Sequence, residues 1–157
     1  MALLIGRHIN KIDRKGRVSV PKPFRATIGQ QGFAGIYAYP SFKYPALEAC
    51  GETFMRRLSE SLESLEMFSD DQDDLASVIL ENAHPLPFDP EGRVMLPKEL
   101  MDYAGIDKDA LFVGRGPLMQ IWDETTYGKH RGQAFQRARS RGATLRLTPV
   151  RSEDGNS

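Results

Sequence analysis

Residues 13–22 read Asp-Arg-Lys-Gly-Arg-Val-Ser-Val-Pro-Lys, and residues 89–98 repeat them as Asp-Pro-Glu-Gly-Arg-Val-Met-Leu-Pro-Lys. The Asp, Gly, Arg, first Val, Pro and Lys recur at identical internal spacing. Self-similarity of this kind is the signature of a duplicated structural unit and has to be recognised before a fold is assigned. The chain is therefore predicted to contain two copies of one unit.

Turn chemistry accounts for most of the repeated motif. Asp is favoured at the first position of a tight turn, and Gly is favoured where the backbone needs a positive φ. Apolar residues flank both turns, which predicts a hairpin in each copy: Ile12, Val18 and Val20 in the first, Phe88, Val94 and Leu96 in the second. Pro21 and Pro97 end the second strand and offer the fixed φ of a helix start.

The arginines at the end of each turn, Arg17 and Arg93, are not required by the turn itself. Two interpretations remain open at this point. In the first, each guanidinium is solvated or pairs with the Asp of its own turn. In the second, it contacts a partner molecule, since a guanidinium at a rigid protruding position is suited to bidentate recognition.

The remaining elements follow from apolar periodicity and from Gly and Pro punctuation. Short helices are predicted at 24–28 and 100–104, and strands at 35–39, 47–50, 110–113 and 118–122. Longer helices are predicted at 54–65, 75–83 and 125–141, the second with a capping box that begins at Ser69. The apolar faces of the first two are predicted to pack in the interior.

The composition is that of an ordinary globular protein, with 157 residues, 40% hydrophobic and 27% charged. This length suits one compact domain or two small fused units. The first residues are too short and wrongly flanked for a signal peptide, and no stretch approaches the length of a membrane span. The single cysteine, Cys50, cannot form an internal disulfide. We therefore expect a soluble cytoplasmic protein without a membrane partner.

Charge is strongly segregated although the net charge is zero. Residues 1–25 carry seven cations against one acid, residues 58–92 carry ten acids and no cation, and residues 129–151 carry seven cations and no acid. Such segregation creates local fields that the total conceals. The acidic run is predicted to be a solvated face, to keep its side of the protein away from phosphates, or to pair with a basic surface of a neighbouring subunit.

No constellation typical of an enzyme is present in the sequence. Gly114-Arg-Gly116 is followed by a proline and a strand rather than a helix, so it does not match a nucleotide-binding loop. Cys50 is better interpreted as a small buried hydrophobe than as a nucleophile. The three histidines are scattered without ligand spacing. We predict no enzymatic activity, no cofactor, no metal and no small-molecule substrate.

Nucleic-acid binding fits the cations better. Phosphate contact requires several cations on one surface, and Arg is the side chain best suited to paired hydrogen bonds with guanine in the major groove. Arg17 is predicted to reach a groove from its turn. Arg14, Lys15, Lys22 and Arg25 are predicted to surround it as phosphate contacts.

The two Asp-x-x-Gly-Arg motifs and their flanks resemble the MraZ family of bacterial transcriptional regulators, over nearly the whole chain. Residues 97–105 and 120–123 are similar to the usual continuation of the second repeat. The resemblance implies an α+β fold, a tandem-repeat AbrB-like swapped-hairpin β-barrel with packing helices. It also implies ring-like homo-oligomers, nucleoid association and repression through short repeated promoter boxes upstream of the division and cell-wall gene cluster.

The resemblance divides the chain into AbrB-like repeats at 1–50 and 85–124, a helical linker at 51–84, a C-terminal helix at 125–145 and a disordered tail at 146–157. The predicted contacts to double-stranded DNA are Arg14, Lys15, Arg17, Lys22, Arg25, Arg93 and Lys98. The second copy has Pro90, Glu91 and Met101 in place of three cations, so the first is expected to carry most of the affinity. The rival interpretation is a ring-forming structural protein with incidental DNA binding.

Overall fold

A computed structural model describes residues 3–150 of the chain. These residues form two compact units, of which one ends at Tyr127 and the other begins at Gly128. The expected disorder of the tail falls partly on residues 151–157, which lie outside the described residues.

The first unit contains both copies of the repeat, separated by helices. The first copy is β1 (Arg7–Lys11), β2 (Arg17–Ser19), α1 (Lys22–Ile28), β3 (Gly35–Pro40) and β4 (Leu47–Cys50). The intervening helices are α2 (Glu52–Glu63), α3 (Asp70–Leu75) and the π-helix η1 (Ala76–Leu80). The second copy is β5 (His84–Pro87), β6 (Arg93–Met95), α4 (Lys98–Ala104), β7 (Asp109–Gly114) and β8 (Met119–Trp122), after which α5 (Glu124–Arg141) begins.

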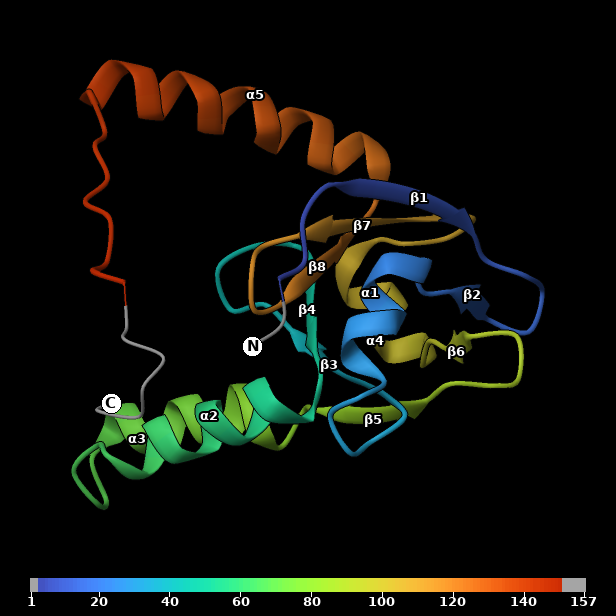
Figure 1. Ribbon diagram of the computed structural model, residues 1–157, viewed down its shortest axis with the longest axis horizontal. Helices are drawn as coiled ribbons and strands as arrows, with labels where there is room; N and C mark the ends of the chain where they lie inside the picture. Colours follow the sequence, from blue (N-terminus) through green and yellow to red (C-terminus); the bar gives the residue numbers. More distant parts are fainter. Residues whose placement is uncertain (1–2, 151–157) are drawn as a thin grey trace. The chain divides into compact units, whose positions relative to one another are not determined.

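The strands form two antiparallel sheets (Figure 1). The larger has the order β1-β7-β8-β4-β3-β5, and the smaller consists of β2 and β6. The strand order of the larger sheet is symmetric between the two copies. Read from either edge, it passes through equivalent strands, because β1, β7 and β8 are equivalent to β5, β3 and β4. Each copy therefore contributes its first strand to the edge of the hairpin of the other copy: β1 lies beside β7, and β5 lies beside β3.

The first predicted hairpin of each copy is wrong in its pairing, although its turn is present. β1 pairs with β7, β5 pairs with β3, and β2 pairs with β6, so the strands on either side of a turn find their partners in the other copy. Val18 lies opposite Val94 in the small sheet, and both are buried. The copies share one apolar pattern, so a strand suits the partner in the other copy as well as its own neighbour. The hairpins β3–β4 and β7–β8 are as predicted.

The expectation of a closed barrel is also wrong, because the large sheet is open with β1 and β5 at its edges. The backbone N–H of Phe88, directly after β5, donates to the carbonyl of Ala34, directly before β3 (2.9 Å). Because successive N–H groups of a strand point to opposite sides, the nitrogens of Pro85 and Pro87 face away from β3. Proline nitrogen carries no hydrogen and confines such a strand to an edge. The outer edge of β5 therefore lacks the backbone N–H donors of Pro85 and Pro87 that another strand would need to pair with it and close the sheet.

The largest hydrophobic cluster joins the two copies. Its largest members include Phe24 and Ile28 from α1, Leu100 from α4, and Ile36 and Phe112 from the large sheet, all at 1% exposure or less. Residues from both copies are packed in one cluster, so neither copy has a complete core of its own. The exchange of strands explains the shared cluster, because the apolar face that each copy would expose on its own is covered by the other copy.

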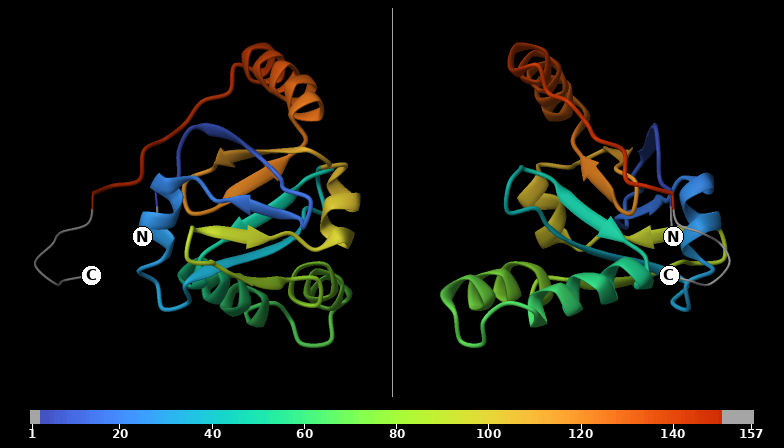
Figure 2. Two further views of the ribbon diagram at one scale, coloured as in Figure 1. Left: turned by 90° about the vertical axis from the view of Figure 1, so that its right-hand side faces the viewer. Right: turned by 60° about the vertical axis from the view of Figure 1, so that its left-hand side comes forward.

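Helices α1 and α4 lie on opposite sides of the strands when the unit is viewed from the end that carries the two turns (Figure 2). They begin directly after Pro21 and Pro97, as predicted from the fixed φ of proline. Each is anchored in the core by its third residue, Phe24 or Leu100. The pseudo-symmetric arrangement places equivalent helices at equivalent turns.

The helices between the copies match the predicted apolar faces. Phe54 and Leu58 of α2 and Leu75 of α3 pack around buried Tyr39, Cys50 and Ile79. The predicted cap at Ser69 is present, since its side chain accepts from the N–H of Gln72 (3.1 Å). The predicted helix at 75–83 is replaced by the end of α3 followed by the π-helix η1, which stops at Leu80.

Helix α5 runs across the boundary between the two units and has no buried residue. Within the second unit, the Arg131 guanidinium lies over the Phe135 ring (5.5 Å to the centroid). Residues 143–150 form no helix or strand. Across residues 3–150, no helix combines the length and the apolar character needed to cross a bilayer.

Candidate nucleic-acid interface

The two Asp-x-x-Gly-Arg turns have the same backbone geometry. In the first, the N–H of Asp13 donates to the carbonyl of Arg17 (2.9 Å), and the N–H of Gly16 donates to the carbonyl of Asp13 (3.0 Å). The second turn repeats both bonds at 2.8 and 2.9 Å. Gly16 and Gly92 adopt φ of +86° and +78°, a conformation that favours glycine. The turn predicted from the sequence is therefore confirmed in both copies.

Each turn is held by the other copy. The carbonyl of Gly16 accepts from the N–H of Leu96 (2.9 Å), and the carbonyl of Gly92 accepts from the N–H of Val20 (3.2 Å). Leu96 and Val20 are both buried in the shared core. The turns are thus fixed to the body of the protein at their glycines, which gives the following arginines a rigid base.

The carboxylate of each turn binds its own arginine. Asp13 accepts from the N–H groups of Lys15 and Arg17 through Oδ1 (2.9 Å each) and from the Arg17 Nε through Oδ2 (2.7 Å). Asp89 makes the matching bonds, with Arg93 Nε at 2.8 Å. Each arginine therefore pairs with the Asp of its own turn, as the first interpretation predicted, and it does so through its Nε atom.

These bonds change the pKa of the charged groups. The backbone N–H of Arg17, followed by its side chain and the N–H of Lys15, lowers the pKa of Asp13 despite some desolvation. The N–H of Arg93 lowers the pKa of Asp89 in the same way. The hydrogen bond to Asp89 raises the pKa of Arg93. Asp13, Asp89 and Arg93 are therefore charged at neutral pH.

The terminal amino groups of the two arginines differ in their surroundings. Arg93 places Nη2 at 3.2 Å from Glu91 and Nη1 at 4.0 Å from Asp13, so acids neighbour both groups. For the Arg17 side chain, the hydrogen bonds and ion pairs found among residues 3–150 involve Nε alone. The 4.0 Å contact also shows that the two turns lie side by side. Arg17 is the motif arginine with amino groups left for an external acceptor.

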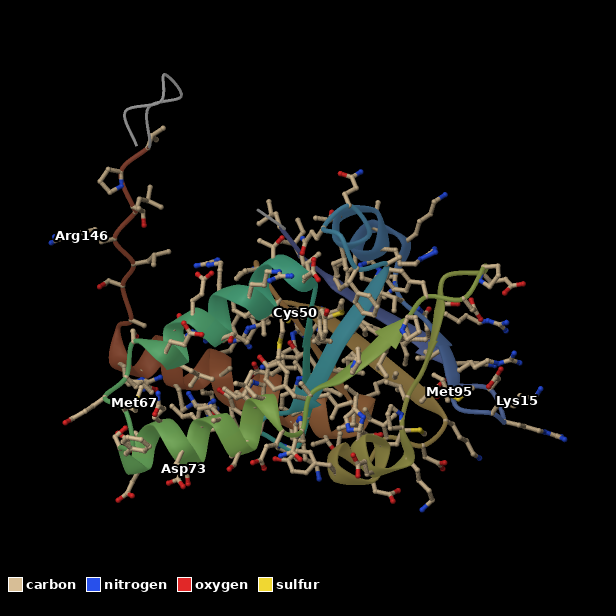
Figure 3. The ribbon with its side chains drawn as sticks, turned by 90° about the horizontal axis from the view of Figure 1, so that it is seen from below. Lys15, Cys50, Met67, Asp73, Met95 and Arg146 are labelled. Atoms are coloured by element: carbon tan, nitrogen blue, oxygen red, sulfur yellow. The ribbon has the colours of Figure 1, made fainter. Side chains whose placement is uncertain are left out.

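A cleft of about 680 Å³ lies beneath the first turn. Its lining includes Met95 and Met101, the cations Arg14, Lys15, Lys98 and Lys108, and the acids Asp13 and Asp107. Arg14 and Lys15 are exposed on the turn, and Figure 3 shows Lys15 and Met95 at the same end of the molecule. Lys98 is also exposed and pairs with Asp102 (3.2 Å). The fold thus gathers cations of both copies at the first turn.

The expectation that Lys22 and Arg25 surround Arg17 is wrong for Arg25. The guanidinium of Arg25 lies against Gly92 of the second turn, and its Nε donates to the carbonyl of Val20 (3.2 Å). Because strands are exchanged between the copies, helix α1 of the first copy places its Arg25 side chain at the second turn. Lys22 is exposed at the start of α1.

Sequence reasoning missed Lys108, which lies in the loop before β7. Its carbonyl accepts from the N–H of Ile12 (2.8 Å), immediately after β1, and its side chain lines the cleft. No local signal marks this lysine, because it reaches the first turn only through the pairing of β1 with β7.

The part of the acidic run that lies in the α2–α3 region is at the end of the unit opposite the turns, whereas Asp89 and Glu91 belong to the second turn. Figure 3 shows Met67 and Asp73, in the α2–α3 region, far from Lys15. Met67 and Phe68 between these helices are 71% and 91% exposed. The acids of the α2–α3 region are therefore distant from the first turn.

Groups with other chemistry are placed unfavourably for catalysis. Cys50 is buried, and burial together with the charge of Glu48 raises the pKa of its thiol to about 12, so it is protonated at neutral pH. Among residues 3–150, no group of three or more His, Cys, Asp or Glu side chains is arranged to hold a metal ion.

Comparison with known proteins identifies close relatives. A family model described as "MraZ protein, putative antitoxin-like" matches residues 79–147. A protein named transcriptional regulator MraZ from Rickettsia canadensis (strain McKiel) is 40% identical over 146 residues, which cover 93% of this chain and 98% of the relative. Proteins with the same name from Rickettsia bellii (strain OSU 85-389) and Rickettsia akari (strain Hartford) are 40% and 38% identical, covering 94% and 93% of this chain and 99% and 98% of the relatives.

Proposed function

The chain belongs to the MraZ family, and from that premise we propose that it is a transcriptional regulator that binds double-stranded DNA through its two turns. One observation carries the proposal. Arg17 is fixed through Nε to Asp13 (2.7 Å), in a turn whose Arg14 and Lys15 line a cleft together with Lys98 and Lys108 of the second copy. The names of the relatives describe regulators rather than enzymes, in agreement with the absence of a catalytic motif in the sequence.

The chemistry divides the site into two kinds of contact. Arg17 is suited to paired hydrogen bonds with guanine O6 and N7 in the major groove. Arg14, Lys15, Lys22 and Lys98 supply the phosphate contacts that set affinity and orientation. Arg93 reads DNA more weakly because Glu91 and Asp13 neighbour its amino groups.

The exchange of strands between the copies supports the AbrB-like swapped-hairpin arrangement that the resemblance implies. β1, β2 and β5 all pair with strands of the other copy. In this arrangement the two copies act like the two halves of a dimer within one chain. A pseudo-twofold relation presents the turns side by side, as the contact between Asp13 and Arg93 requires (4.0 Å).

Assembly and target follow from the family resemblance. We propose a ring-like homo-oligomer in the cytoplasm, associated with the nucleoid, whose subunits bind short repeated promoter boxes. Several weak contacts then add by multivalency on tandem boxes. Occupation of the promoter upstream of the division and cell-wall gene cluster would occlude transcription, which makes the protein a repressor.

A ring-forming structural protein is the second candidate. The observation in its favour is the placement of opposite charges at opposite ends of one unit, with Lys15 at one end and Asp73 at the other (Figure 3). Because the cationic and acidic ends cannot contact each other within one chain, they could form head-to-tail contacts between neighbouring chains. In this case salt dissociates the oligomer itself, whereas DNA binding is incidental.

A salt titration separates the two candidates. The affinity for duplex DNA from upstream of the coding sequence is measured from low to moderate salt, with light scattering in parallel. The regulator is expected to lose affinity steeply while its oligomer persists, and Arg17→Ala is expected to weaken binding without changing the oligomer. Arg56→Ala is a matched control, because Arg56 is an exposed arginine on α2 with one loose ion pair to Glu52 (3.6 Å). An affinity indifferent to both salt and Arg17→Ala contradicts the regulator.

A further inference from the structure

The position after the core anchor of each short helix differs between the copies. In α1 this residue is Arg25, next to Phe24, and in α4 it is Met101, next to Leu100. Strand exchange places each residue at the turn of the other copy. Arg25 therefore lies at the second turn, and Met101 lies beneath the first.

Arg25 is bound closely to the second turn. A Cβ atom built on Gly92 would clash with the Arg25 guanidinium, so the planar group rests directly on the glycine. Its Nε donates to the carbonyl of Val20 (3.2 Å), and the N–H of Val20 donates to the carbonyl of Gly92 (3.2 Å). The guanidinium is thus fixed relative to the turn. Among residues 3–150, the hydrogen bonds and ion pairs found for Arg25 leave its terminal amino groups without an acceptor.

The first turn has the opposite arrangement. Met101 and Gly16 line the open cleft, so the position that Arg25 fills at the second turn contains no cation at the first. The first turn carries its own cations at Arg14 and Lys15, whereas the second has Pro90 and Glu91 at these positions. Each turn therefore has at least one nearby cation besides its motif arginine, but the second receives its cation from the other copy.

We propose that Arg25 is the phosphate-contacting residue of the second turn, contributed by the first copy. This rests on the proposed DNA binding and assigns to Arg25 a different turn from the one the sequence indicated. A guanidinium held through Nε retains two amino groups in a fixed plane, which suits a phosphate acceptor. The contribution offsets the negative charge of Glu91 at the same turn.

The test compares Arg25→Met with Arg25→Lys in DNA titrations at several salt concentrations. Arg25→Met uses the residue that the second copy carries at this position. It is expected to weaken binding about tenfold per subunit engaged and to make the slope of log affinity against log salt shallower by about 0.9 for the lost contact. Arg25→Lys keeps the charge and is expected to retain the slope. If Arg25→Met loses affinity with an unchanged slope, Arg25 only braces the turn and the proposal is overturned.

A double-mutant cycle locates the contact. Arg25→Met is expected to be non-additive with Arg93→Ala, which acts at the same turn, and additive with Arg17→Ala, which acts at the other. Coupling to Arg17 alone contradicts the proposal. A wild-type protein that binds duplex DNA without any salt dependence contradicts the proposed function instead, so the two failures are distinguishable.

The reciprocal variant provides a gain of contact. Met101→Arg places a guanidinium beneath the first turn, where the cleft has room for it. It is expected to steepen the salt slope by about 0.9 per subunit engaged. An unchanged slope contradicts the claim that this helix position faces phosphate.

Discussion

The two turns share a backbone and its hydrogen bonds but differ in the charges that surround them. Asp13 and Asp89 make the same hydrogen bonds, within about 0.1 Å, to the arginine and backbone of their own turns. Among residues 3–150 no acceptor is found for the terminal amino groups of Arg17, while Arg93 has Glu91 and Asp13 beside its own. Duplication has therefore kept the shape of the turn in both copies and left the charges free to diverge.

The cause lies in what the fold requires. The glycine of each turn binds a buried residue of the other copy, so both turns must keep their geometry if the shared core is to form. The residues between Asp and Gly are exposed and make no such demand. Pro90 and Glu91 can replace Arg14 and Lys15 at no cost to the core.

The largest effect is expected in the shared core. Phe24→Ala should cost about 3–5 kcal/mol of unfolding free energy and Leu100→Ala about 2–5 kcal/mol, because both are almost fully buried in one cluster. Each variant should shift one cooperative transition of the whole first unit, followed by urea titration of Trp122 fluorescence and of circular dichroism. Two separable transitions, of which each variant moves one, would show that the copies fold independently.

The next effect concerns the turn glycines. Alanine at a positive φ costs about 1–2 kcal/mol, so Gly16→Ala and Gly92→Ala should both destabilise the protein in urea. Gly92→Ala should cost more, because its Cβ displaces the Arg25 guanidinium, whereas at Gly16 the nearest contact is the carbonyl of Leu96 at 3.3 Å. Adding Arg25→Met to Gly92→Ala should remove the excess. Equal costs for the two alanines would contradict the placement of Arg25.

A smaller effect is expected when the charges of the first turn are transferred to the second. Pro90→Arg combined with Glu91→Lys removes the acid beside Arg93 and adds two cations. Affinity for promoter DNA should rise about tenfold, with a steeper salt dependence. Glu63→Lys is the control, since Glu63 is an exposed acid on α2 away from the turns. An equal gain from Glu63→Lys would mean that net charge, rather than the turn, sets the affinity.

The smallest difference between the turns is expected in acid. The folded pKa of Asp13 and of Asp89 is lowered, mainly by the backbone N–H of the following arginine, so each carboxylate stabilises the fold above its unfolded pKa, near 3.9. This stabilisation is lost as the pH falls through the lowered folded values. Asp13→Asn and Asp89→Asn should flatten the pH dependence of unfolding below about pH 4, and by equal amounts. Unequal changes in acid titrations would show that the turns are not equivalent in the folded state.

Local features of the fold were predictable from the sequence. Both turns, the proline-started helices, the hairpins β3–β4 and β7–β8 and the cap at Ser69 follow from residue chemistry within a few positions. The pairing of β1, β2 and β5 was not predictable, because two copies with one apolar pattern offer each strand two suitable partners. Closure of the sheet was wrongly expected, although Pro85 and Pro87 mark β5 as an edge.

The same limit applies to the candidate site. Arg14, Lys15 and Arg17 are consecutive or nearly so, and the sequence alone brings them together. Lys108 and Arg25 reach their turns only through strand exchange. Distance along the sequence therefore gave no signal for Lys108, and it assigned Arg25 to the first turn instead of the second. Local chemistry thus predicted the turn, and long-range pairing decided which charges gather at it.

We expect the first turn to carry most of the DNA affinity. The most direct test is a parallel titration of Arg17→Ala and Arg93→Ala against the same promoter duplex at one salt concentration, with the oligomer checked by light scattering. Arg17→Ala is expected to lose about tenfold or more per contact, and Arg93→Ala clearly less. Equal losses, or a larger loss for Arg93→Ala, would contradict the account.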